Sequence, residues 1–130
     1  MTDHELLKCA AEAMHNLKDP NFCNYSVVDG KVGVCLDLGS HRGAITSYWN
    51  PLTDDADALR LAVKLNLRVM PQEKCVYVES NPDSVLGFAS VSEMEMNGDH
   101  PYAATRRAIV RAAAGIGKQI KGGQHGDAKP

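Results

Sequence analysis

The sequence predicts an α+β protein, a layered α/β/α-type sandwich in which three helices cover mostly antiparallel strands. Three segments carry the apolar spacing of helices, and two runs of three short strand-like segments lie between them. The resulting order, α-βββ-α-βββ-α, has too few helices between the strands for a doubly wound parallel sheet. A length of 130 residues with 44% hydrophobic content is typical of one domain around one core.

The first helix is expected over residues 2–18. Thr2 and Glu5 have the spacing of a capping box, which satisfies free N–H groups at a helix start. Apolar residues then recur every three or four positions and form one face. Asp19-Pro20 ends the helix, because proline disfavours the helical conformation in the residue before it.

The first group of strands begins with a hairpin. Residues 25–28 and 31–36 are rich in Val and flank Asp29-Gly30, a pair that tolerates the positive φ angles of a tight turn. A third strand is expected over residues 44–49.

The second helix is expected to begin at Thr53 as its N-cap and to run to about Leu65. Pro51 ends the preceding strand, and three aspartates in the first turn complement the positive end of the helix dipole. Two apolar stripes run along this helix; they consist of Ala56, Leu59, Ala62 and Val63, and of Ala58, Leu61 and Leu65. A helix this apolar touches more than one partner. We therefore expect one stripe to pack on a sheet and the other to meet a neighbouring helix or a second subunit. Ala58, Leu61 and Leu65 are the candidates for an interface in a homo-oligomer.

The second group of strands is expected over residues 67–70, 74–79 and 85–91, followed by a last helix from about residue 101 to residue 120. Residues 122–130 contain three glycines and no large apolar side chain. The prediction is therefore one domain over residues 1–121 and a disordered tail over 122–130.

Composition narrows the classes of function. The net charge of −2 argues against binding to polyanions over the whole surface. The polar N-terminus lacks the pattern of a secretory signal, and the sequence contains no run of about 18 apolar residues, so we expect no membrane span. The four cysteines form no Cys-x-x-Cys pair and the five histidines are scattered, so we expect no metal site and no cofactor.

Two segments of the chain carry a resemblance. Residues 48–59 hold the entry Trp-Asn-Pro-x-Thr-Asp followed by an Ala-rich helix, and residues 104–114 hold a second Ala-rich helix. This pattern resembles the phage ABA-sandwich domain family, small proteins encoded by tailed phages and prophages, over residues 43–120. The family has no established activity. The resemblance implies a phage origin and a sandwich architecture. Because the N-terminus lacks the pattern of a secretory signal, we expect reduced cysteines and a place in the cytoplasm of the host cell.

The last helix is the main candidate for a binding surface. Residues 101–130 hold six of the fourteen Lys and Arg residues and one of the sixteen acids. Candidates for contact with phosphates or an acidic protein are Arg106, Arg107, Arg111 and Lys118, with His100 at the helix start. The alternative is a solvated helix face, either free in solvent or paired with the acidic half of another subunit.

Two further features, Trp49 and the order of elements in residues 54–120, allow nucleic-acid or nucleotide binding as an alternative interpretation. The single tryptophan, Trp49, is either a core anchor or a platform on which a base stacks. The order αβββα is also that of double-stranded-RNA-binding domains, but their Lys-rich cluster is replaced here by Arg106 and Arg107, and the second helix starts with aspartates.

The sequence therefore predicts a non-enzymatic binding protein that acts on host machinery or antiviral defence. It would work as a homo-oligomer that binds a host protein or a small nucleotide. No paired nucleophile and base, phosphate loop or metal spacing is evident, and Glu93 and Glu95 are interpreted as solvated charges. The alternative function is a nucleic-acid-binding module that uses the basic last helix.

Overall fold

The computed structural model describes residues 2–17, 24–28, 31–35, 47–81, 89–94 and 101–126. The elements are α1 (Asp3–Asn16), β1 (Asn24–Val28), β2 (Lys31–Cys35), β3 (Ser47–Trp49), α2 (Asp55–Lys64), β4 (Arg68–Pro71), β5 (Cys75–Glu79), β6 (Ser90–Met94) and α3 (Pro101–Gly126). The capping box that begins α1 is confirmed, because the Thr2 side chain accepts from the Glu5 N–H and the Glu5 side chain accepts from the Thr2 N–H.

The strands form two antiparallel sheets of three strands each, in the orders β1-β2-β3 and β4-β5-β6. Val28 pairs with Lys31, so a two-residue connection joins β1 to β2, as the Asp29-Gly30 pair predicts. These two turn residues themselves lie outside the described part of the chain.

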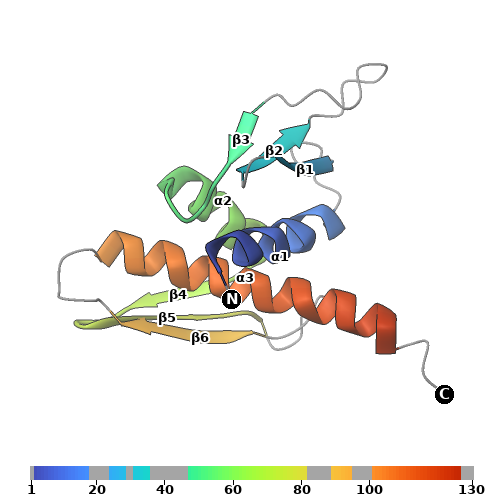
Figure 1. The fold of residues 1–130 in the computed structure, drawn as a ribbon. Coiled ribbons are helices and arrows are strands. Elements are labelled where there is room, and N and C mark those ends of the chain that lie inside the picture. Colours follow the sequence, from blue (N-terminus) through green and yellow to red (C-terminus); the bar gives the residue numbers. More distant parts are fainter. Residues whose placement is uncertain are drawn as a thin grey trace.

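The α+β class, the antiparallel strands and the order of helices and strands are confirmed. The finer α/β/α layering is not confirmed. Figure 1 shows α1 and α2 beneath the β1–β3 sheet, α3 across the middle and the β4–β6 sheet below α3. Contacts between α1 and α3 are the most extensive of the fold, and α3 packs on β5 and β6. The helices therefore form the centre of the molecule.

Small residues explain the close contact between α1 and α3. The residues with fully covered side chains in the two helices are mostly alanines: Ala10, Ala11, Ala13, Ala108, Ala112 and Ala113. At Gly117 the backbones come closer still, since a Cβ atom there would lie 1.9 Å from the carbonyl oxygen of Cys9. Alanine and glycine let two helix backbones approach, and this approach buries both helices against each other.

The start of α2 differs from the prediction by one residue. Asp54, not Thr53, is the N-cap, and its carboxylate accepts from the Asp57 N–H at 2.8 Å. The Thr53 hydroxyl instead lies 3.5 Å from the Asn50 carbonyl oxygen, because residues 51–53 form a turn. Aspartate and threonine are both good caps, so sequence alone does not separate adjacent candidates.

The end of α2 has the hydrogen bonds of a Schellman motif. The Leu67 N–H donates to the Ala62 carbonyl and the Asn66 N–H to the Val63 carbonyl. Asn66 has a φ of 54°, a left-handed conformation that asparagine tolerates better than most residues. This turn aims the chain from α2 directly into β4.

The last strand and the last helix also differ from their predicted limits. β6 (Ser90–Met94) extends beyond the predicted strand end at residue 91, and its ladder with β5 pairs Glu79 with Ser90 and Cys75 with Met94. Residues 82–88 lie outside the described part of the chain. The helix α3 continues past the predicted end at residue 120 as far as Gly126, and residues 127–130 of the predicted tail are outside the described part.

Among the described residues, no helix is both long enough and apolar enough to cross a membrane.

Candidate functional site

The segment that leads into α2 is held by a set of short-range hydrogen bonds. Trp49 and Pro51 are buried and anchor the segment in the core. The Asn50 side-chain oxygen accepts from the Leu52 N–H, and the Asp57 carboxylate accepts from the Asn50 N–H, both at 3.0 Å. The entry Trp-Asn-Pro-x-Thr-Asp is thus a rigid corner that sets the position of α2.

Arg106 ties this corner to α3. Its Nε donates to the Leu52 carbonyl at 2.9 Å, and its Nη1 lies 2.6 Å from the Asp55 carboxylate. The arginine side chain is four-fifths covered. It therefore sets the spacing between the start of α2 and the start of α3.

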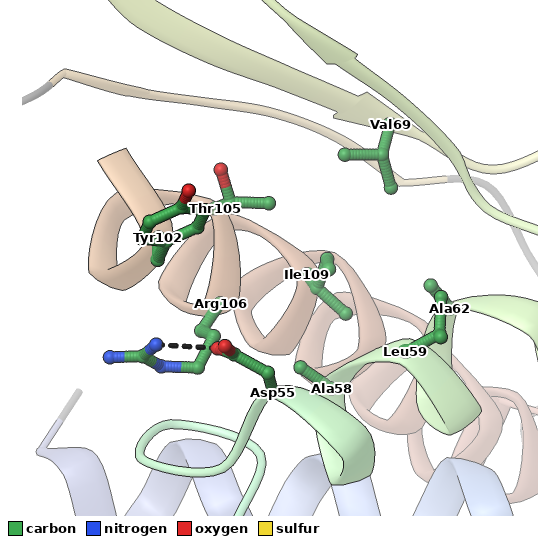
Figure 2. Close-up of a pocket in the computed structure, with 9 residues that line it drawn as sticks. All are labelled: Asp55, Ala58, Leu59, Ala62, Val69, Tyr102, Thr105, Arg106 and Ile109. Carbon is green, nitrogen blue, oxygen red and sulfur yellow. Dashed lines mark hydrogen bonds and ion pairs between the residues drawn. The ribbon is translucent and has the colours of Figure 1, made fainter. Parts of the chain in front are cut away.

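A groove opens between α2, α3 and β4, with a volume of about 330 Å³. Figure 2 shows the side chains around it, with the Arg106–Asp55 pair at one end and Val69 of β4 at the other. We call it the α2–α3 groove; it is lined by Asp55, Ala58, Leu59, Ala62, Val69, Tyr102, Thr105, Arg106 and Ile109.

The α2–α3 groove offers an apolar surface with few polar groups. Most of its lining side chains are hydrocarbon or aromatic. The Thr105 hydroxyl donates to the Pro101 carbonyl at 2.7 Å, and the Arg106 charge is matched by Asp55. Leu59 and Tyr102 stand at the rim and are 64% and 73% exposed. A groove with these properties suits an apolar side chain better than a phosphate.

Two of the predicted binding arginines make contacts within the chain. Arg107 lies 2.9 Å from the Asp3 carboxylate of α1 and 3.9 Å from that of Glu93 on β6. Arg111 lies 2.7 Å from Glu93 and donates to the Ser92 carbonyl at 3.0 Å. Glu93, interpreted from sequence as a solvated charge, is instead mostly covered and faces both arginines. The structure therefore places Arg107 and Arg111 as links between α3 and its neighbours.

The remaining predicted ligand contacts do not come together. Lys118 is exposed, two turns beyond Arg111 along α3. Trp49 is 6% exposed, which agrees with a core anchor and leaves no open face for a stacked base. His100 lies outside the described part of the chain.

The predicted interface residues on α2 are corrected by the structure. Ala58, Leu61 and Leu65 are 2%, 0% and 3% exposed within a single chain, so they belong to its core. α2 contacts α3, which is the neighbouring-helix alternative for this apolar helix. The stripe that remains in solvent holds Ala56, Leu59 and Val63.

Sequence analysis missed Leu59 and Tyr102 as site residues. Tyr102 shares the spacing of the apolar residues of the last helix. Its position in the sequence therefore indicates a side chain that packs in the core, not one exposed to solvent. The two apolar stripes on α2 could have indicated these residues, because they predict a second apolar surface on this helix. They do not indicate which of the two stripes stays exposed to solvent.

In the described ranges, no group of three or more His, Cys, Asp and Glu side chains is placed to hold a metal ion. The two cysteines described in detail, Cys9 and Cys75, are free and half-buried.

Comparison with protein families, with curated proteins and with solved structures found no match to this chain.

Proposed function

We propose that this protein is a non-enzymatic binding protein that docks a protein partner through the α2–α3 groove. The observation that carries the proposal is the pairing of an open, apolar groove with two exposed apolar side chains at its rim, Leu59 and Tyr102. Exposed aromatic and aliphatic residues around a concave surface mark sites where one large side chain of a partner is buried. The partner would insert a leucine or an aromatic side chain between α2 and α3.

A protein partner is favoured over a small nucleotide. A nucleotide needs cationic groups for its phosphates and a flat face for its base. At the groove, Arg106 already faces Asp55 and Leu52, and Trp49 is buried. The apolar lining would leave a phosphate without hydrogen-bond partners.

The nucleic-acid alternative has less support for a related reason. Arg107 and Arg111 each face a carboxylate of this chain, so binding to a phosphate backbone would compete with an existing ion pair. Lys118 also belongs to the predicted basic set and is exposed, but it lies two turns beyond Arg111 along α3.

The biological setting of the proposal comes from the sequence resemblance. A small phage protein in the cytoplasm of its host would use such a groove against host machinery or an antiviral defence protein. Under this proposal the protein acts by occupying a surface of its target and changes no covalent bond.

Methyl NMR with two chemically different probes tests the proposal. Six residues of the groove carry methyl groups that report on a bound probe: Ala58, Leu59, Ala62, Val69, Thr105 and Ile109. We expect N-acetyl-leucine amide or N-acetyl-tryptophan amide to shift these methyl signals saturably, with a dissociation constant on the order of millimolar. Adenosine monophosphate should leave them unchanged.

A matched pair of variants sharpens this experiment. Tyr102→Ala should weaken probe binding about fivefold, the equivalent of ~1 kcal/mol for one aromatic contact. Tyr48→Ala, which removes an exposed tyrosine from β3 in the other sheet, should have no effect. Probe-induced shifts confined to methyl groups outside the groove would rule out the proposed site, and a response to the nucleotide alone would favour the small-ligand hypothesis.

A further inference from the structure

The strand β6 lies at one end of the β4–β6 sheet, farthest from β4 (Figure 1). Within the described ranges, no further strand pairs with its outer side. Ser90 and Ser92 of this strand are exposed. Free backbone groups on an outer strand can pair with a strand of another molecule, so an open edge is a hazard for a folded protein.

The hydrogen bonds between β5 and β6 show which backbone groups lie at this open edge. In an antiparallel pair, hydrogen-bonded positions alternate with positions that are not bonded to the partner strand. The Ser80 N–H donates to the Ala89 carbonyl at 2.8 Å, one position beyond the pair of Glu79 and Ser90. By alternation, the N–H and C=O groups of Ser90 and Ser92 point away from β5. We call these four groups the β6 edge.

Arg111 of α3 covers the centre of the β6 edge. Its Nη1 donates to the Ser92 carbonyl at 3.0 Å and lies 2.7 Å from the Glu93 carboxylate. The Glu93 side chain is mostly covered, so it holds the guanidinium in place over the strand. A strand that adds to this edge needs the Ser92 carbonyl as an acceptor, and Arg111 already occupies it.

The opposite edge of the same sheet is also blocked. The Gln72 N–H donates to the Cys75 carbonyl at 2.7 Å, next to the pair of Pro71 and Val76 in the ladder between β4 and β5. By the same alternation, the backbone nitrogen of Pro71 points away from β5. Proline has no N–H group, and its place on an outer strand removes a donor from that edge. Each end of this sheet therefore carries a residue that hinders pairing.

We propose that Arg111, positioned by Glu93, prevents the β6 edge from pairing with β6 of a second copy of this chain. Without the guanidinium, two β6 strands can pair antiparallel about a twofold axis at Ser92, and each Ser92 N–H then donates to the Ser92 carbonyl of the other copy. A twofold contact closes on itself. Because Pro71 blocks the other end of the sheet, the product is a dimer and not a fibre.

This inference goes beyond the proposed function and does not depend on it. The β6 edge shares no residue with the α2–α3 groove. It gives Arg111 a role that needs no ligand, namely to keep one edge of the sheet unpaired.

Light scattering coupled to gel filtration tests the role of Arg111. Arg111→Met removes the donor and keeps an apolar side chain beside the sheet. We expect its mass to rise with concentration toward twice that of the unmodified chain, whose mass is 14.1 kDa per copy and stays constant. Arg107→Met is the matched control, because Arg107 also carries a charge beside Glu93 but pairs with Asp3. It should leave the mass unchanged.

Amide hydrogen exchange locates the contact. In the unmodified chain the Ser92 N–H should exchange fast and the Val91 and Glu93 N–H groups, which bond to β5, should exchange slowly. In concentrated Arg111→Met, exchange at Ser92 should slow by at least about tenfold. Adding Ser92→Pro to Arg111→Met removes the central donor of the new contact and no bond to β5, so it should restore the mass of the unmodified chain.

Each outcome decides the proposal. It is overturned if Arg111→Met keeps the mass of the unmodified chain at every concentration, or if Arg107→Met associates to the same extent. Association that leaves exchange at Ser92 unchanged, or that survives Ser92→Pro, places the contact elsewhere and also overturns it. Circular dichroism checks the fold of each variant. If Arg111→Met is unfolded, Glu93→Gln decides instead: it removes the charge that holds Arg111 and should produce the same association more weakly.

Discussion

Single atoms limit how close α1 and α3 come. Gly117 and Gly115 both lie on α3, two residues apart, but their surroundings differ. A Cβ atom at Gly117 would overlap the backbone of Cys9, whereas a Cβ atom at Gly115 would lie 3.5 Å from the Ala89 Cβ, an ordinary contact distance. Two glycines that look equivalent in the sequence therefore have different roles.

We expect Gly117→Ala to lower the free energy of unfolding by about 1–3 kcal/mol, because the helices must move apart to admit the methyl group. Gly115→Ala should raise it by up to about 1 kcal/mol, because alanine favours the helix and the added atom fits. Urea unfolding followed by circular dichroism measures both. Equal stabilisation by the two substitutions would show that the close approach at Cys9 does not limit the packing.

At the scale of an element, α2 is a short helix whose two ends are specified locally. Asp54 caps its start and the Asn66 turn closes its end. Its ten residues are too few to be stable alone, so the caps and the contact with α3 together hold it in place. The α2–α3 groove depends on that placement.

The capping assignment leads to a prediction at this scale. Asp54→Ala should reduce the free energy of unfolding by about 1 kcal/mol, because the Asp57 N–H loses its acceptor. Thr53→Ala should change it by less than about 0.5 kcal/mol, since the threonine hydroxyl makes only a long contact with Asn50. Thermal or urea unfolding distinguishes them, and a larger loss for Thr53→Ala would reassign the cap.

At the scale of the whole molecule, the core is centred on helices rather than on a sheet. The side of α2 with Leu61 packs inward and the side with Leu59 faces solvent. Leu61 therefore contributes to the stability of the folded chain, whereas Leu59, two positions away on the same helix, is part of its exposed surface.

This division predicts unequal effects for one substitution. Leu61→Ala should lower the free energy of unfolding by about 2–5 kcal/mol, because it leaves a cavity in the core. Leu59→Ala should change it by less than about 0.5 kcal/mol, because most of the Leu59 side chain is already in solvent. Comparable losses for the two leucines would mean that Leu59 is buried in the protein as it exists in solution.

The amino-acid sequence by itself determined the features that depend on neighbours along the chain. The capping box at Thr2 and Glu5, the two-residue connection between β1 and β2, and the order of helices and strands all follow from local spacing. The start of α2 was correct to within one residue, because several good capping residues stand side by side there.

Tertiary structure alone decided which apolar stripe of α2 is open and which charges are already matched. Leu59 and Leu61 are the same residue type on the same helix, and only the tertiary packing decides that Leu61 is buried and Leu59 is exposed. Arg107 meets Asp3 across 104 positions of sequence, so no local pattern indicates that pair. The spacing of residues along the sequence shows that one face of a helix is apolar or charged. Whether that face is buried or ion-paired depends on which distant segments of the chain pack against it.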